Sequence, residues 1–306
     1  MLDNWLFLAL LAPFFWALVN VIDVYFVKGI YKSEYDGIII SGVFQILPWL
    51  LVPILGIGGE IKAFGTLLAV LGGFLYMLGI FFYFRSLFAQ ADAALIVIIW
   101  STVGVVVPLV EAIVFGERLT LMQYFGIAIT FFGTALLSTD FRLRSRKLGK
   151  IYANMIFAVA FCSVALILED RAYDRVSFWN GTLFISLGAF LCGMFFWLIR
   201  PGEKNSHVRL AKRYFKIFFV AEALALFGMV VSYKAIQSGL VSLVSAVENV
   251  QPVWIMAISL AIFFFAKLIR LKSTEAIRAI KEDQIVSWKI KLVAVLVTAI
   301  GVYLVS

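Results

Sequence analysis

Three carboxylates lie inside long apolar segments of this sequence, where their presence needs a chemical explanation: Asp23, Glu222 and Glu248. A charged side chain at the centre of a membrane-spanning helix costs about 2.5–3.5 kcal/mol on insertion scales. A carboxyl group held at that depth can exchange protons or pair with a cationic ligand. The three residues therefore predict a binding or proton-transfer site in apolar surroundings.

Asp23 belongs to a polar pattern in the first apolar segment. Trp16, Asn20 and Asp23 follow one another at spacings of four and three residues, which places them on one face of a helix. Asp23 also lies near the end of its segment, where it could reach water or Lys28. The pattern is thus either part of a binding face or a paired carboxylate at the membrane surface.

The densest polar cluster is Glu248-Asn249-Val250-Gln251-Pro252. Proline leaves a carbonyl unbonded on the preceding turn, and such a break inside hydrocarbon is tolerated only against protein or a wet cavity. Glu222 lies at a comparable depth, about 11 Å from the start of its own segment. The alternative to a binding site is a structural cluster that only joins helices.

These patterns define a candidate site. We predict substrate or proton binding by Glu248, Asn249, Gln251, Glu222, Asp23, Asn20 and Trp16. Glu111 is a further candidate, either for the same cavity or for the membrane surface. Aromatic side chains that could line the cavity are Tyr76, Tyr83, Trp100 and Tyr233, although lipid contact is the usual role of such residues.

Motifs for other chemistries are missing from the sequence. It contains no HExxH motif, no GxSxG elbow and no Walker A sequence. The single histidine, His207, lies in a polar segment, and Cys162 and Cys192 lie in apolar segments as small hydrophobic residues would. We therefore expect no enzyme activity, no metal site and no cofactor.

The composition indicates which elements must position the candidate site. Of the 306 residues, 63% are hydrophobic and 14% are charged, whereas about a quarter of the residues of a globular protein are charged. A membrane-spanning helix needs about 20 largely apolar residues. By that measure the chain is an all-α polytopic membrane protein with ten transmembrane helices, at Trp5–Val27, Gly37–Ile57, Ala63–Phe84, Ala91–Phe115, Leu121–Ser138, Ile151–Leu168, Phe178–Ile199, Phe215–Ala235, Leu240–Ala266 and Ile290–Val305.

The ten segments divide into two similar halves, residues 1–138 and 151–306, joined by a basic linker at 139–150. An offset that aligns Gly104 with Pro252 also aligns Leu95 with Leu243, and Gly133 matches Gly301 near the end of each half. Because each half has an odd number of segments, the two halves must have opposite orientations. This is the inverted-repeat plan of many secondary transporters, with the substrate site at the repeat interface.

Basic residues are concentrated in the loops on one side of the predicted membrane. Of the 26 Lys and Arg residues, 21 fall on the side that holds the second-half insert at 267–289 and 5 on the other, which places both termini outside the cytoplasm. The insert mixes basic and apolar residues and predicts an amphipathic helix on a leaflet surface. The formal net charge of +8 is thus explained by anionic lipids and not by nucleic acid.

The first half carries a resemblance to a known family. Its sequence Ser101-Thr102-Val103-Gly104, followed by Gly116-Glu117-Arg118-Leu119, Gln123, Gly126 and Gly133, resembles the EamA-type drug/metabolite transporters. The spacing of Trp16, Asn20 and Asp23 is similar to the pattern in one branch of that family. Two features depart from it, since Gly104 stands where proline is common and Phe264-Phe265-Ala266-Lys267 replaces the second Gly-Glu-Arg-Leu turn.

The resemblance implies ten helices in two five-helix halves and secondary transport, often proton-linked export. It also implies termini in the cytoplasm, opposite to the charge distribution. Our hypothesis is a secondary active transporter in the inner (plasma) membrane, monomeric or homodimeric, which moves a small metabolite or drug-like solute by alternating access. The alternatives are a lipid or lipid-precursor translocase that uses residues 267–291, and a membrane scaffold without transport activity.

Overall fold

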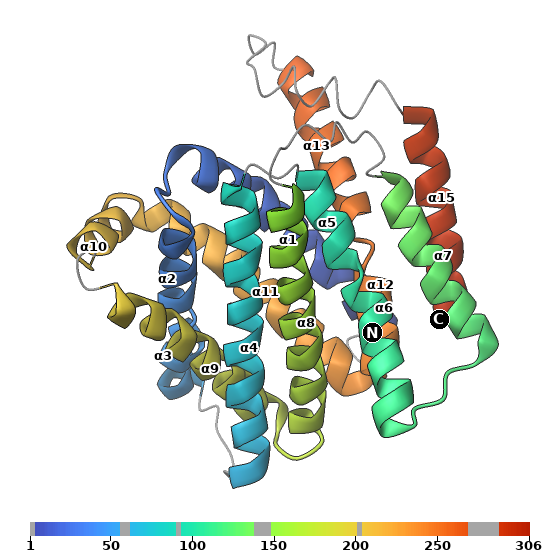
Figure 1. Ribbon diagram of the computed structural model, residues 1–306, viewed down its shortest axis with the longest axis horizontal. Coiled ribbons are helices and arrows are strands. Elements are labelled where there is room, and N and C mark those ends of the chain that lie inside the picture. Colours follow the sequence, from blue (N-terminus) through green and yellow to red (C-terminus); the bar gives the residue numbers. More distant parts are fainter. Residues whose placement is uncertain (1–3, 56–61, 90–92, 138–147, 201–203, 269–287) are drawn as a thin grey trace.

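The computed structural model describes residues 4–55, 62–89, 93–137, 148–200, 204–268 and 288–306. Within these ranges every regular element is a helix (Figure 1). The helices are α1 Trp5–Gly29, α2 Glu34–Phe44, α3 Leu47–Leu55, α4 Ala63–Phe88, α5 Ala93–Ser101, α6 Val103–Val110, the π-helix η1 Glu111–Phe115, α7 Leu121–Leu137, α8 Leu148–Tyr173, α9 Phe178–Ile199, α10 Lys204–Arg213, α11 Phe215–Ser238, α12 Val241–Glu248, α13 Gln251–Leu268 and α15 Trp288–Val305.

The chain is a multi-pass membrane protein. Seven helical stretches in the described ranges are long and apolar enough to cross a bilayer: Trp5–Gly29, Ala63–Phe88, Ile98–Phe115, Gly149–Tyr173, Phe178–Ile199, Phe215–Ser238 and Val241–Phe265. Two further apolar helices, Leu121–Leu137 and Lys291–Val305, are shorter. The predicted segment Gly37–Ile57 is divided between α2 and α3. The all-helical membrane fold is confirmed, whereas the predicted count of ten spans remains a prediction.

Helices from the two halves of the chain pack directly against one another. α4 lies against α8 and α9, α1 against α11, and α7 against α15. Between α2 and α9, a Cβ atom added to Gly42 would lie 2.6 Å from the Cα atom of Gly193. Small residues allow such close approach, which is how helices associate without a hydrophobic driving force in lipid.

Two broken helices meet at the centre of this bundle. One consists of α5, α6 and η1, and the other consists of α12 and α13. The two meet where α12 packs against α6. The break between Glu248 and Gln251 precedes Pro252 directly, which confirms the helix interruption predicted there. A Cβ atom on Gly104 of α6 would lie 2.7 Å from the carbonyl oxygen of Ser245 in α12. Glycine at this position therefore lets the two broken helices touch.

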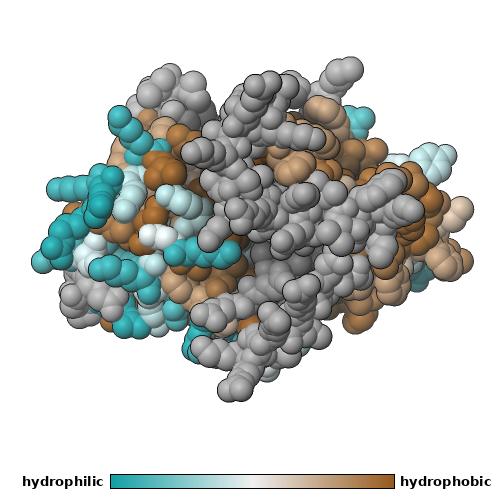
Figure 2. Space-filling model, turned by 90° about the horizontal axis from the view of Figure 1, so that it is seen from above, coloured by the Kyte–Doolittle hydropathy of each residue, from teal (hydrophilic) through white to brown (hydrophobic). Residues whose placement is uncertain are grey.

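A short basic helix, α10, lies at one end of the bundle. Its His207 side chain is buried and lies 3.2 Å from the Asp36 carboxylate of α2. In the view from above, hydrophilic residues gather at the left, where α10 lies, and mostly apolar residues cover the right (Figure 2). Residues 138–147 of the predicted linker and 269–287 of the predicted amphipathic insert lie outside the described residues.

Candidate functional site

An internal cavity lies among the central helices, with about 150 Å³ open to the centre of a water-sized sphere. Side chains from α1, α2, α4, α5, α8, α11 and α12 contribute to its wall. All seven predicted site residues line it: Trp16, Asn20, Asp23, Glu222, Glu248, Asn249 and Gln251. The structure thus brings together residues that are more than 200 positions apart in the sequence.

One end of the cavity holds Asp23 and Glu222. The Ser41 hydroxyl donates a hydrogen bond of 2.5 Å to Oε1 of Glu222, and the Tyr83 hydroxyl donates one of 3.0 Å to Oδ1 of Asn20. Asp23, one turn beyond Asn20 on α1, interacts electrostatically with Glu222 on α11. The packing of α1 against α11 therefore brings two carboxylates to one place.

The other end is built at the break between α12 and α13. Glu248, the last residue of α12, accepts a hydrogen bond from Ser232 of α11, and its Oε1 atom has no partner in the described part of the chain. The Nδ2 atom of Asn249 is also buried without a partner and faces Gly104. Buried polar groups are almost always hydrogen-bonded, so orphaned atoms beside a cavity indicate a ligand or water that completes them.

Aromatic side chains cover part of the wall between the two ends. The expected residues Tyr76, Tyr83 and Trp100 line the cavity, and the rings of Tyr83 and Trp100 meet edge to face at 5.8 Å. The expectation for Tyr233 is wrong, because its face of α11 turns toward α8. There its ring lies 5.9 Å from that of Tyr173, outside the cavity lining.

A further buried carboxylate, Glu169 of α8, was not among the predicted site residues. Its side chain is fully buried, neither carboxylate oxygen has a hydrogen-bond partner among the described residues, and it interacts electrostatically with Glu248. A Cβ atom on Gly72 of α4 would lie 2.8 Å from its Cγ atom. The apolar segment predicted from hydropathy ends at Leu168, whereas α8 continues to Tyr173 and includes Glu169.

Smaller residues of the lining were missed as well. Ser41, Gln45, Ser101 and Ser245 all face the cavity. Cys162, interpreted as a buried hydrophobic residue, is buried and also lines the cavity wall, and both cysteines are free thiols. Serine and cysteine are common in apolar helices, so their presence alone carries no signal of a site.

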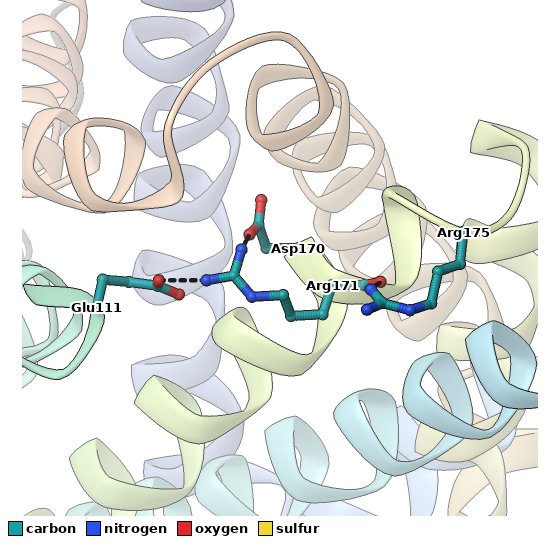
Figure 3. A network of polar contacts seen from close by, with 4 residues as sticks. All are labelled: Glu111, Asp170, Arg171 and Arg175. Carbon is teal, nitrogen blue, oxygen red and sulfur yellow. Dashed lines mark hydrogen bonds and ion pairs between the residues drawn. The ribbon is translucent and has the colours of Figure 1, made fainter. Parts of the chain in front are cut away.

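Glu111 belongs to a different polar cluster. Figure 3 shows the Arg171 guanidinium between two carboxylates, bonded through Nη2 to Glu111 and through Nη1 to Asp170 at 2.9 Å. Arg175 donates a hydrogen bond of 2.5 Å to the backbone carbonyl of Arg171. Glu111 is fully buried and is absent from the cavity lining. Its charge is thus matched within the chain, and of the two roles considered for it the cavity role is wrong.

Comparisons with known proteins identify the fold but no function. No known protein family matches the sequence, and no curated protein matches it. A solved structure described as "Crystal structure of protein" matches with a TM-score of 0.66 and 15% sequence identity. The match covers 99% of this chain and 98% of the other. The whole fold is therefore shared with a solved protein.

Proposed function

We propose that this protein is a secondary active transporter that moves a small solute across the plasma membrane by alternating access. One observation carries the proposal, namely a central cavity whose polar wall comes from both halves of the chain. In transporters built from repeats, the substrate site lies at the repeat interface and is formed by discontinuous helices. The breaks at Ser101–Val103 and at Glu248–Gln251 supply discontinuous helices of this kind.

The proposal includes a ten-span plan of two inverted five-helix repeats, at residues 1–138 and 151–306. A two-fold relation produces reciprocal contacts, in which residue i meets j and the equivalent of j meets the equivalent of i. The 168-residue offset that matches Gly133 to Gly301 also matches Thr130 to Thr298. A Cβ atom on Gly133 would meet the backbone of Thr298, and one on Gly301 would meet the backbone of Thr130. These reciprocal contacts support the repeat.

Packing between whole helices supports the same plan. In that repeat, α4 and α8 are the third and sixth spans, and α11 and α1 are the eighth and first. The contact of α4 with α8 is therefore the counterpart of the contact of α11 with α1, and both are among the most extensive in the bundle. Together with the residues shared with the EamA-type transporters, this arrangement supports membership of that group.

Glu248 is proposed to bind either a proton or a cationic group of the substrate during transport. The test is counterflow in proteoliposomes, with a radiolabelled solute chosen by a thermal-shift screen of amino acids, polyamines, nucleobases and cationic drugs. Glu248→Gln keeps the shape of the side chain and removes its charge, so we expect at least a tenfold loss of counterflow. Asp174→Asn removes an exposed carboxylate outside the cavity and should leave counterflow unchanged.

Equal counterflow in Glu248→Gln and in the unchanged protein would remove Glu248 from the mechanism. A complete absence of counterflow for every solute that stabilises the protein would favour the scaffold alternative. The lipid-translocase alternative depends on residues 267–291, most of which lie outside the described residues. A scramblase assay with fluorescent lipids, with and without that segment, tests it separately.

A further inference from the structure

We infer that the cavity binds a linear organic dication, with one ammonium group beside Asp23 and Glu222 and the other beside Glu248. This inference rests on the proposed function, because it names the class of solute that the same cavity would carry. Four features of the cavity support it: the sign of its charges, the distance between them, the wall that separates them and the charge behind one end.

The charge of the lining has one sign. Among the described residues, the cavity is lined by the carboxylates of Asp23, Glu222 and Glu248 and by no Lys, Arg or His side chain. Elsewhere in the bundle the chain supplies a cation of its own, as Arg171 does for Glu111. A carboxylate that is buried without a cation is costly, so this lining favours a cationic ligand over an anionic one.

The carboxylates are separated along the bundle axis. Glu248 bonds to Ser232, and Ser232 follows Glu222 by ten residues on the continuous helix α11. Ten residues of α-helix rise about 15 Å. The two carboxylates are thus anchored at levels of α11 about 15 Å apart, a separation that suits two ammonium groups at the ends of one chain better than a single ammonium group.

The wall between the two ends suits an extended carbon chain. The Tyr76 side chain lines the same cavity as Glu222 and Glu248 and adds an aromatic face to it. Trp16 and Trp100 add aromatic faces, which attract ammonium groups and methylene units next to them. The remaining lining is largely apolar and includes Val19, Met77, Ile80, Leu166 and Met229.

Glu169 strengthens the acidic character of one end. It does not line the cavity, yet it interacts electrostatically with Glu248, and its oxygens have no partner among the described residues. A positive charge bound at Glu248 therefore acts on two buried carboxylates, as a positive charge at Asp23 and Glu222 does at the opposite end. Each end thus has a pair of carboxylates for one ammonium group.

The test measures binding by isothermal titration calorimetry with the purified full-length protein in detergent. The probes are α,ω-diaminoalkanes of increasing chain length, the n-alkylamines of the same lengths and the matching dicarboxylates. We expect affinity for the diamines to rise with length to an optimum, where the diamine binds at least tenfold more tightly than the alkylamine. We expect no binding of the dicarboxylates. Equal affinity for diamine and alkylamine at every length, or tighter binding of a dicarboxylate, would overturn the inference.

Variants at the two ends provide a second measurement. Glu222→Gln and Glu248→Gln should each lower the affinity for the optimal diamine toward that for the alkylamine, while Asp174→Asn leaves it unchanged. Circular dichroism and gel filtration establish folding for each variant, and Glu222→Gln alone still tests the inference if Glu248→Gln does not fold. Unchanged diamine affinity in a folded variant of either end would contradict the two-ended site.

Counterflow of the same diamine separates this inference from the proposed function. Tight diamine binding without counterflow would support the class of ligand and contradict transport. Counterflow of another solute by a protein that does not bind diamines would support transport and contradict the class of ligand.

Discussion

Two groups of carboxylates inside the helix bundle differ in what balances their charge. At the end of α8, the Arg171 guanidinium lies between Glu111 and Asp170, so the chain itself supplies the cation. In the cavity, Glu222 and Glu248 accept hydrogen bonds from serine hydroxyl groups, and among the described residues no basic side chain lines the wall beside them or beside Asp23. Under the proposed function, the first group stabilises the fold and the second binds a ligand.

The largest expected effect comes from breaking the first group. Arg171→Met leaves the fully buried Glu111 without its cation, and removal of one partner of a buried pair costs about 3–5 kcal/mol. We expect a fall of that size in the free energy of unfolding, measured by denaturant titration in mixed micelles. The double variant Arg171→Met with Glu111→Gln should recover most of the loss, since no unpaired charge remains. A single variant as stable as the unchanged protein would mean that Glu111 is balanced by another group.

A second substitution, Gly104→Ala, changes the shape of the cavity wall without changing its charge. In Gly104→Ala, the added methyl group would press on the Asn249 side chain and the Ser245 carbonyl, and overpacking typically costs about 1–3 kcal/mol. We expect a lower melting temperature together with weaker diamine binding. Gly149→Ala is the matched control, because no atom lies within 4 Å of its added Cβ. Normal diamine binding in Gly104→Ala would show that the contact of α6 with α12 does not shape the site.

The next prediction applies to the carboxylate behind the cavity. Glu169→Gln replaces a buried group that has no partner among the described residues by a neutral one of the same shape. We expect the free energy of unfolding to rise by about 0.5–2 kcal/mol, as is common when a functional site is relaxed, while diamine affinity falls. The same titration and calorimetry measure both. Lower stability would indicate that Glu169 belongs with Glu111, as a group that the fold requires.

The apolar helices and many residues of the cavity lining could be predicted from the sequence, because polar residues are conspicuous in apolar segments. Charges such as Glu222 and Glu248 stand out in apolar segments, and Pro252 predicts the break beside them. Glu169 was missed because hydropathy cannot detect that a helix continues past polar residues. Here the helix continues where Arg171 is held by Glu111, 60 residues away in the sequence. A contact over such a separation depends on how helices pack, and no local pattern encodes it.

The smallest expected effect separates burial from charge within the arginine cluster. Arg175 belongs to the same helix end as Arg171, but it is exposed and bonds only to a backbone carbonyl in this cluster. Exposed polar contacts contribute little, because water replaces the lost partner, so Arg175→Gln should change the free energy of unfolding by less than about 1 kcal/mol. Measured beside Arg171→Met, it compares the loss of an arginine bonded to a buried carboxylate with the loss of an exposed arginine bonded to a backbone carbonyl. A loss as large as that in Arg171→Met would mean that the net charge of this helix end stabilises the fold, and not the buried pair with Glu111.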